Sequence, residues 1–285
     1  MEFYKSESQF SCQGVFNAGK TVILSPNKRD RPNPSKPMKG SEKMYKYELH
    51  CHTGTVSRCA SIDPKALVRR YADAGYDGIV LTDHFSPMTF LGGHFFAPQK
   101  DLDFYLSSYH TLKAYCGSAF PVLLGLELRH YATVNDYLVY GVDERWLRRQ
   151  GNLLLWDERT MSRNLHDAGC LVYQAHPYRP FITRCDPTLL DGIEVFNGHT
   201  DERANYDALL WAQKHGKPMI SGSDTHHETD RICGGIRTET PIGTNEELLD
   251  VLRTQSYTLI TDGDRPATHA LTLERIGTHA QNQTR

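Results

Sequence analysis

The chain of 285 residues lacks the features of several protein classes. No apolar run approaches the length of about 20 residues that a membrane-spanning helix needs, so we expect no membrane partner. The formal net charge is only −2, which gives no support for an extended nucleic-acid surface, because such a surface needs an excess of Lys and Arg. The first residues lack the basic-then-apolar order of a secretory signal. The composition is typical of a soluble globular protein.

The seven cysteines are odd in number and include no CxxC pair. Their spacing therefore predicts neither a zinc finger nor a disulfide framework. Scattered free thiols are typical of a reducing compartment, so we expect a cytoplasmic location. Cys51 stands between two histidines of a predicted strand, and the alternation of side chains should turn it to the opposite face, where it fits a small core position.

Between about Met44 and Thr261 the sequence alternates strand-like and helix-like segments. The clearest helix begins at Asp63-Pro64, with Asp as the N-cap and Pro at the first helical position, and ends near Gly75. Further helices are predicted near residues 99–116, 157–168, 201–215 and 245–254. Strands that alternate with helices predict an α/β fold with a parallel sheet, and about seven such units favour a closed or nearly closed barrel.

The sequence divides into three predicted regions. Residues 1–43 form an N-terminal extension that ends in a Pro-rich, basic linker, residues 44–264 form the barrel, and residues 265–285 form a polar tail. A phosphate-loop pattern occurs at Gly14 to Thr21, but no good strand precedes it and Pro26 follows too soon for a helix. We therefore do not interpret it as a nucleotide site.

Most of the predicted strands carry a metal-binding type of side chain at one end. A barrel of parallel strands gathers the carboxyl ends of its strands at one mouth, so these side chains should converge there. Residues two apart on a strand face the same way, so His50 and His52 can enter one site, and Asp224 and His226 repeat this spacing. Imidazole and carboxylate ligands suit zinc, manganese and iron(II). The leading prediction is a polynuclear metal site.

Six short motifs, in this order along the chain, resemble those of the PHP (polymerase and histidinol phosphatase) family. They are Glu48-Leu-His-Cys-His-Thr53, Asp77-Gly-Ile-Val-Leu-Thr-Asp-His84, Gly125-Leu-Glu127, His176-Pro177, Glu194-Val-Phe-Asn197 and Gly222-Ser-Asp-Thr-His226. The resemblance implies a distorted (β/α)7 TIM-like barrel with the metal site at the carboxyl ends of the strands. It also implies two or three divalent ions (Zn, Mn or Fe) and the hydrolysis of phosphoesters.

The resemblance also implies a ligand set. The first ion would be held by His50, His52 and Asp224, the second by Glu127, as a bridge, and His176, and the third by His84 and His226. The family usually supplies one more histidine to the second ion, and here Asp136 is the local substitute. Where many relatives have a further ligand after the two histidines, this chain has Arg58, which cannot bind a cation.

The expected chemistry is hydrolysis by water that divalent ions activate. His199 or His226 is a candidate to protonate the leaving group, and Arg58, Arg129 or Arg179 to bind phosphate oxygens. Because the chain is not basic overall, we expect a small phosphorylated metabolite or nucleotide as substrate. The oligomeric state is open.

Three alternatives follow from the same residues. The enzyme could act on histidinol phosphate or as an oligonucleotide exonuclease. A non-catalytic barrel that merely binds metal is favoured by Arg58 and by the missing second-site histidine. A hydrolase of C–N bonds usually carries a carboxylated Lys on a central strand, and no Lys stands at a predicted strand end here.

Overall fold

The computed structural model describes residues 43–261. The phosphate-loop pattern at 14–21, the tail at 265–285 and all of the predicted N-terminal extension except Lys43 therefore lie outside the described residues. The strands are β1 (Tyr45–Glu48), β2 (Gly78–Leu81), β3 (His84–Phe85), β4 (Val122–Leu124), β5 (Leu126–Leu128), β6 (Tyr137–Tyr140), β7 (Leu171–Gln174), β8 (Gly192–Asn197), β9 (Met219–Gly222), β10 (Ile236–Thr238) and β11 (Thr258–Leu259). The α-helices are α1 (Pro64–Asp73), α2 (Leu102–Tyr105), α3 (Ser107–Cys116), α4 (Glu144–Arg149), α5 (Glu158–Asp167), α6 (Glu202–Lys214) and α7 (Asn245–Thr254). Short 3-10 turns are η1 (Pro98–Asp101), η2 (Leu153–Leu155) and η3 (Pro187–Leu189).

The strands form two sheets, so the predicted α/β fold is confirmed, although within residues 43–261 they do not close into one sheet. One sheet has the order β11-β10-β1-β2-β4 and the other β3-β5-β6-β7-β8-β9. Backbone hydrogen bonds join the sheets at two places. The Gly125 N–H, between β4 and β5, donates to Leu81 O (2.9 Å), and a parallel bridge pairs Cys51 with Thr225 beyond the ends of β1 and β9.

The prediction of an all-parallel sheet is wrong at β6. This strand is antiparallel to both of its neighbours, β5 and β7, so its first residue lies at the edge where β5 ends. The sequence reads Asn135-Asp136 before the apolar run, and an apolar run does not reveal the direction of its strand. Asp136 is therefore brought to this edge by the start of a strand and not by its end.

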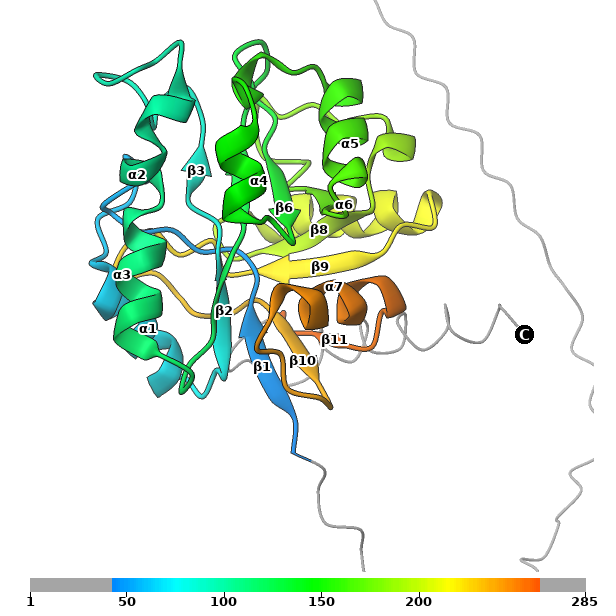
Figure 1. The fold of residues 1–285 in the computed structure, drawn as a ribbon. Coiled ribbons are helices and arrows are strands. Elements are labelled where there is room, and N and C mark those ends of the chain that lie inside the picture. Colours follow the sequence, from blue (N-terminus) through cyan, green and yellow to red (C-terminus); the bar gives the residue numbers. More distant parts are fainter. Residues whose placement is uncertain (1–42, 262–285) are drawn as a thin grey trace, which may run out of the picture. The chain divides into compact units, whose positions relative to one another are not determined.

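Each predicted helix is present, and local capping explains most of the boundaries. Asp63 accepts a hydrogen bond from Ala66 N and Pro64 opens α1, while α7 begins with a reciprocal capping box between Thr244 and Glu247. The short helix α4 and the antiparallel strands β10 and β11 were not predicted. In Figure 1, α1, α2 and α3 lie along one flank of the strands, and α4, α5 and α6 lie on other sides. Among the described residues, no helix is long and apolar enough to cross a membrane.

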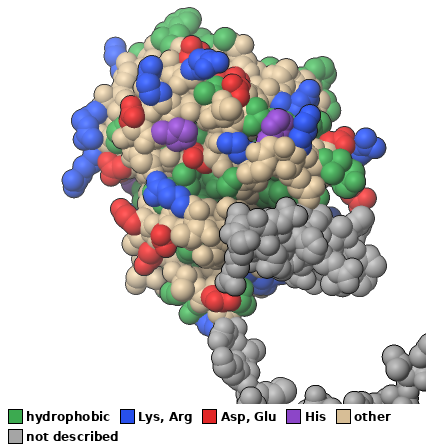
Figure 2. Space-filling model, turned by 90° about the vertical axis from the view of Figure 1, so that its right-hand side faces the viewer, with side chains coloured by type: hydrophobic (Ala, Val, Ile, Leu, Met, Phe, Trp, Pro, Cys, Tyr) green, Lys and Arg blue, Asp and Glu red, His purple; other side chains and the backbone are tan. Residues whose placement is uncertain are grey.

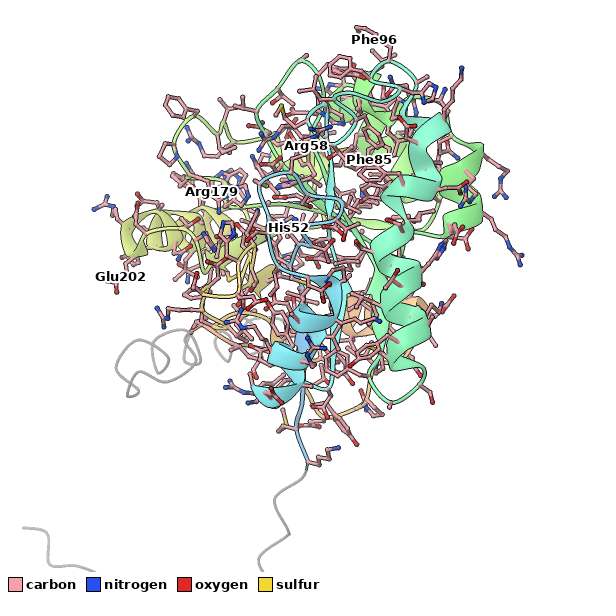
Figure 3. All side chains as sticks on the ribbon, turned by 90° about the vertical axis from the view of Figure 1, so that its left-hand side faces the viewer. His52, Arg58, Phe85, Phe96, Arg179 and Glu202 are labelled. Atoms are coloured by element: carbon pink, nitrogen blue, oxygen red, sulfur yellow. The ribbon has the colours of Figure 1, made fainter. Side chains whose placement is uncertain are left out.

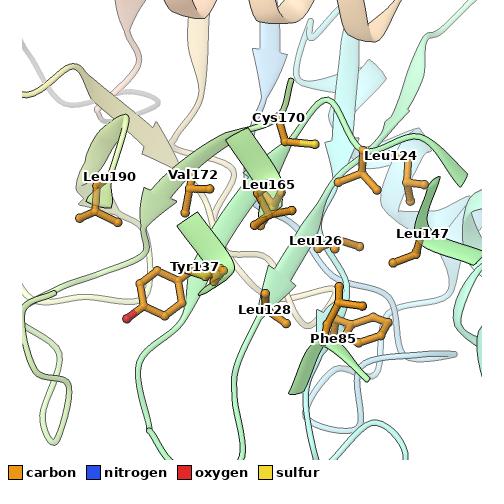
Figure 4. Packing of buried hydrophobic residues seen from close by; sticks show 14 of the residues in the cluster. Phe85, Leu124, Leu126, Leu128, Tyr137, Leu147, Leu165, Cys170, Val172 and Leu190 are labelled. Carbon is orange, nitrogen blue, oxygen red and sulfur yellow. The ribbon is translucent and has the colours of Figure 1, made fainter. Parts of the chain in front are cut away.

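Successive side chains of a strand point to opposite faces, and this alternation separates the hydrophobic core from the polar site. On β5, Leu126 and Leu128 belong to the largest cluster of buried hydrophobic residues, while Glu127 between them faces the other way. Figure 4 shows this packing between the strands and residues such as Leu147 of α4 and Leu165 of α5. The helices thus cover the outer faces of the strands, and the polar side chains of the same strands are left to meet inside.

Candidate metal centre

The residues after β1 alternate in the same way. Leu49 and Cys51 enter hydrophobic clusters, as expected for Cys51, whereas His50 and His52 turn to the opposite side and are fully buried. The continuation of β9 holds this segment, because the Asp224 N–H donates to His50 O (2.8 Å) and the His52 N–H to Thr225 O (3.0 Å). β9 comes so close that a Cβ on Gly222 would lie 2.4 Å from that of His50, so only glycine fits there.

Glu127 is the centre of the histidine cluster. Its Oε1 accepts a hydrogen bond from His176 Nε2 (3.0 Å) and lies 3.2 Å from His50 Nε2. Its Oε2 lies 2.6 Å from His84 Nδ1 and 3.3 Å from His52 Nε2. One buried carboxylate therefore lies close to four imidazoles that come from three segments of the chain, with His50 and His52 on the same one.

Asp224 is the second carboxylate of the cluster. Its Oδ1 lies 3.1 Å from His52 Nε2, 3.3 Å from His50 Nε2 and 3.4 Å from His226 Nδ1. Asp224 and His176 both have a positive φ, of 56° and 30°, which is uncommon for residues other than glycine. Such backbone strain concentrates at functional sites, where the surrounding structure maintains it.

Several donor atoms of the cluster are placed where a metal ion could bind them, but they do not form hydrogen bonds with one another. His50 Nε2, Glu127 Oε2 and His176 Nδ1 are buried and have no hydrogen-bond partner. The 2.6 Å contact of Glu127 Oε2 with His84 is one of proximity only, because the atoms do not have hydrogen-bond geometry. Unpaired buried polar atoms are costly, and a cation would satisfy them. Groups of donors within 4.8 Å of one another that could hold an ion include His50-His52-Asp224, His50-Glu127-His176 and His52-His84-His226.

Glu194 orients the cluster from behind. Its Oε1 lies 2.8 Å from His50 Nδ1, and its Oε2 accepts hydrogen bonds from the His176 N–H (2.9 Å) and Asn197 Nδ2 (3.0 Å). A carboxylate on Nδ1 keeps the proton there and leaves Nε2 free to face a metal, the usual arrangement for a ligating histidine. Glu194 thereby directs the unpaired nitrogen of His50 toward Glu127 and Asp224.

Burial and mutual charge perturb the cluster strongly. Burial alone would lower the pKa of His50, but the carboxylates of Asp224, Glu194 and Glu127 raise it well above its ordinary value. Burial lowers the pKa of His52 well below its ordinary value, and the neighbouring His84 and His226 add to this. Burial would raise the pKa of Glu127, yet His84 and His50 hold it well below the usual range. The pKa values of the neighbouring His50 and His52 are thus shifted in opposite directions, which is typical of functional sites where several charged groups are buried together.

Asp136 and Arg129, two sequence candidates, bind each other. The Arg129 guanidinium donates two hydrogen bonds to the Asp136 carboxylate, with Nε 2.6 Å from Oδ1. Asp136 Oδ2 lies 3.8 Å from His176 Nε2 and belongs to a possible ligand group with His84 and Glu127. Asp136 is thus close to the cluster, but its negative charge is paired with the Arg129 guanidinium. Arg129 is correspondingly less free to bind a substrate.

The other two arginines differ in position. Arg179 donates to Asp224 Oδ2 (2.6 Å) and to Asn197 Oδ1 (2.9 Å), so its guanidinium stands at the rim of the cluster, partly exposed. Arg58 is exposed and donates to Leu91 O, away from the carboxylates. Figure 3 shows Arg179 and Arg58 in the same region as His52, with Phe96 farther out. Arg129 thus contacts the substitute ligand Asp136, Arg179 contacts the predicted ligand Asp224, and Arg58 contacts neither.

His199 also lies beside the cluster. Its Nε2 is 3.0 Å from Asp230 Oδ2, and its ring centroid is 5.5 Å from that of His226. Asp230 is fixed by the backbone N–H groups of His226 and His227, each 2.7 Å from its Oδ2. His199, His226 and Asp230 form a further group of possible ligands at the rim.

Sequence reasoning missed three residues around the cluster, Asp83, Asp230 and Cys59. Asp83 accepts hydrogen bonds from Thr53 and Ser57 (2.7 Å each), and burial raises its pKa to about 6 against these bonds, which lower it. Asp83 lies next to His84 within a quoted motif, so adjacency could have indicated it. Asp230 belongs to none of the motifs, so nothing in the sequence selected it. Burial would raise the pKa of the Cys59 thiol, but the neighbouring His226 and His84 lower it to about 6.

Comparisons with known proteins give one family match and several solved structures of similar fold. Residues 202–257, which include α6, β9, β10 and α7, match the family model described as PHP-associated. A two-domain protein from Bacteroides vulgatus that contains a predicted PHP-like metal-dependent phosphoesterase is similar in structure, with a TM-score of 0.57 and 16% identity over 83% of this chain and 70% of that one.

The fold of the chain is therefore similar to that of a PHP-like protein. PsfC from Pseudomonas syringae is similar over 85% of this chain and 99% of its own, with a TM-score of 0.57 and 13% identity. The lesion-specific endonuclease EndoQ from Pyrococcus furiosus is similar over 76% of this chain and 58% of its own, with a TM-score of 0.52 and 14% identity. A search of curated proteins finds no match. The family match and these likenesses support the PHP relationship that the six motifs indicated.

Proposed function

We propose that this protein is a divalent-metal-dependent phosphoesterase that hydrolyses a small phosphorylated metabolite or nucleotide. The observation that carries the proposal is the pair of buried, unpartnered atoms His50 Nε2 and Glu127 Oε2, in a cluster of imidazoles and carboxylates. His50, His52, Glu127, His176 and Asp224 would hold two ions. Divalent ions held there would activate water for attack on phosphorus and neutralise charge on the phosphate oxygens.

The remaining roles follow from the contacts of the chain's own side chains. The Arg179 guanidinium already binds a carboxylate at the rim, and the same planar donors suit the oxygens of a phosphate. The His199 imidazole, paired with Asp230, is positioned to give a proton to the leaving oxygen. We assign these roles to Arg179 and His199 in preference to Arg58 and Arg129, whose guanidinium groups are engaged elsewhere.

A small substrate is favoured by the charge of the visible surface. On the face shown in Figure 2, Lys and Arg side chains alternate with Asp and Glu and do not form a continuous basic patch. Long nucleic acid binds through such patches. The likeness to a lesion-specific endonuclease makes short oligonucleotides the second substrate class to assay.

We also propose that the two sheets are parts of one distorted seven-stranded barrel. β4 and β5 are consecutive pieces of one segment interrupted at Gly125, and they pair with β2 and β3 respectively. The bridge between Cys51 and Thr225 brings the end of β1 to the end of β9. This arrangement supports a ring whose polar mouth contains Glu127 and Asp224.

The test is hydrolysis of generic phosphoesters by the full-length protein with Mn²⁺ or Zn²⁺, before and after chelation. We expect turnover that chelation abolishes and added metal restores. His52→Ala should reduce kcat/KM by at least about 100-fold, the usual scale for loss of a group that acts directly in catalysis.

His215→Ala is the matched control, because His215 is exposed at the end of α6 and should not matter. Full activity in chelated His52→Ala protein would refute the metal-dependent mechanism. Stoichiometric metal binding without turnover of phosphoesters or short oligonucleotides would instead support a non-catalytic metal-binding module.

A further inference from the structure

Ser57 and Asp83 are two buried side chains that lie behind His52, on the side of its ring away from Asp224. The Asp83 carboxylate accepts hydrogen bonds from the Thr53 N–H, the Thr53 hydroxyl and the Ser57 hydroxyl, each over 2.7 Å. Among residues 43–261, Asp83 is in none of the groups of donors that could hold an ion. Its hydrogen bonds therefore point to a role in arranging the residues that follow the two histidines.

The Ser57 hydroxyl has a single proton, and its neighbours decide where that proton goes. Ser57 Oγ lies 2.7 Å from Asp83 Oδ1 and 3.3 Å from His52 Nδ1. It also accepts a hydrogen bond from the His84 N–H (3.0 Å). An ionised carboxylate can only accept, and hydrogen bonds to it are shorter and about twice as strong as those between neutral groups. The Ser57 proton therefore goes to Asp83, and toward His52 the Ser57 oxygen can only accept.

This use of the Ser57 proton selects one tautomer of His52. Because Ser57 Oγ can only accept, Nδ1 of His52 must carry the proton, and Nε2 of the neutral imidazole then has a free lone pair. Nε2 lies 3.1 Å from Asp224 Oδ1 and 3.3 Å from Glu127 Oε2, which is itself buried and unpartnered. A proton on Nε2 would satisfy Asp224, but it would leave the lone pairs of Nδ1 and Ser57 Oγ facing each other. The hydrogen bonds behind the ring thus favour the tautomer whose Nε2 a cation would satisfy.

His50 has the same arrangement in a simpler form. Glu194 Oε1 lies 2.8 Å from His50 Nδ1, so a carboxylate acts on this imidazole directly. For His52 the carboxylate of Asp83 acts through the Ser57 hydroxyl. Both histidines are thereby held with Nε2 toward the same two carboxylates, those of Glu127 and Asp224.

We propose that Ser57 and Asp83 are positioning residues, which hold His52 as the tautomer with its proton on Nδ1 and so prepare Nε2 for a divalent ion. This inference rests on the proposed metal centre and adds to it the residues that set the protonation of one ligand. No proton has to leave Nε2 when an ion binds, because Nδ1 already carries it. Loss of such an outer partner of a ligand typically weakens metal binding by about 10- to 100-fold.

The direct readout is the tautomer of His52 in the metal-free, full-length protein. Nitrogen chemical shifts of labelled histidine rings distinguish the two tautomers, and comparison with the spectrum of His52→Ala identifies the signals of His52. We expect the proton on Nδ1 in the wild type. In Ser57→Ala, Nδ1 has lost its acceptor, so we expect the proton on Nε2, where Asp224 can accept it.

The second readout is the affinity for Zn²⁺, measured by competition with a chelating dye. Ser57→Ala should bind Zn²⁺ about 10- to 100-fold more weakly than the wild type. The substitution removes one hydroxyl, while Asp83 keeps both of its hydrogen bonds from Thr53.

Ser162→Ala is the matched control. Ser162 is also a buried serine whose Oγ lies 3.3 Å from the Nδ1 of a histidine, His166. In the part of the chain that the structure describes, His166 is in none of the groups that could hold an ion. The affinity of Ser162→Ala for Zn²⁺ should therefore equal that of the wild type.

Two results would overturn the proposal. One is a proton on Nε2 of His52 in the metal-free wild type, a measurement that remains decisive even if Ser57→Ala does not fold. The other is a Ser57→Ala protein that folds and binds Zn²⁺ as tightly as the wild type.

Failure of this proposal is distinguishable from failure of the proposed function. Zinc binding and hydrolysis that are unchanged in Ser57→Ala would leave the phosphoesterase standing and remove Ser57 and Asp83 from its machinery. Zinc binding that weakens in Ser57→Ala, in a protein that turns over no phosphoester, would retain the positioning role and remove the activity.

Discussion

At the scale of single residues, Arg179 links the cluster to the space where a substrate would bind. Its Nη2 satisfies Asp224 Oδ2, and the other donors of its planar group remain at the rim. The pKa of Asp224 lies well below its ordinary value: burial would raise it, but His50, His52 and Arg179 lower it. Arg179 therefore has two effects, one on the charge of a candidate ligand and one on a bound phosphate.

Replacement of Arg179 separates these effects. We expect Arg179→Ala to reduce kcat/KM by about 10- to 100-fold, because a hydrogen bond to a charged group contributes about 1.5–3 kcal/mol. Arg179→Lys should recover only part of this loss, since an ammonium cannot bind two oxygens in one plane. Steady-state kinetics on one phosphoester measures both variants.

Arg58→Ala is the comparison that decides between the arginines. Arg58 contacts only a backbone carbonyl among its described hydrogen bonds, so its removal should leave kcat/KM within about twofold. If Arg58→Ala were the more damaging change, the phosphate-binding role would belong to Arg58 and our assignment would be wrong.

Residue patterns explain what the sequence predicted and what it did not. His50, His52, His84, Glu127, His176, Asp224 and His226 converge because strand alternation and the order of strands bring them to one edge, and both properties are legible in a sequence. That they bind metal remains a prediction. Cys59 was not singled out, because the sequence test for cysteines looks for other cysteines nearby, whereas the histidines that lower the pKa of its thiol lie elsewhere in the chain.

At the scale of elements, the strands and helices with long patterns were predictable and the short ones were not. α6 has 13 residues between an Asp cap and a glycine, whereas β10 and β11 have three and two residues and too little pattern to recognise. The direction of β6 was also hidden, because a period of two is the same when read backward. Tertiary pairing, not local sequence, decided it.

The helix α7 allows a test of local stability away from the cluster. Thr244→Ala removes one half of the capping box and should lower the free energy of unfolding by about 1 kcal/mol, as measured by urea denaturation. Thr244→Ser keeps the hydroxyl and is the matched control. Metal content should be the same in all three proteins, and a loss of metal in Thr244→Ala would mean that α7 supports the site directly.

At the scale of the whole molecule, the unsatisfied cluster makes stability dependent on metal. Buried carboxylates and imidazoles without a cation are costly, and an ion that binds only the folded chain stabilises it by about 4 kcal/mol at a thousandfold excess over its Kd. For a domain of this size that corresponds to an increase of about 10 °C in Tm. Differential scanning calorimetry with chelator and with Zn²⁺ measures the shift.

His52→Ala provides the control for this shift, because its folded state has lost one of the imidazoles near both carboxylates. The increase in Tm with Zn²⁺ should be clearly smaller in the variant than in the wild type. An equal increase in both would place the stabilising ion elsewhere on the molecule.

The reversed strand β6 has one more consequence, which concerns insertion and deletion. Because β5 and β6 run in opposite directions, their connection, residues 129–136, lies at the mouth and carries Arg129 and Asp136. The connection from β6 to β7, residues 141–170, leaves from the opposite end and includes α4 and α5. Changes of length should therefore be tolerated in the second connection without altering which molecules enter the site. In the first connection, even one added residue would reshape the entrance, so this short hairpin is where a shift in substrate preference should be sought.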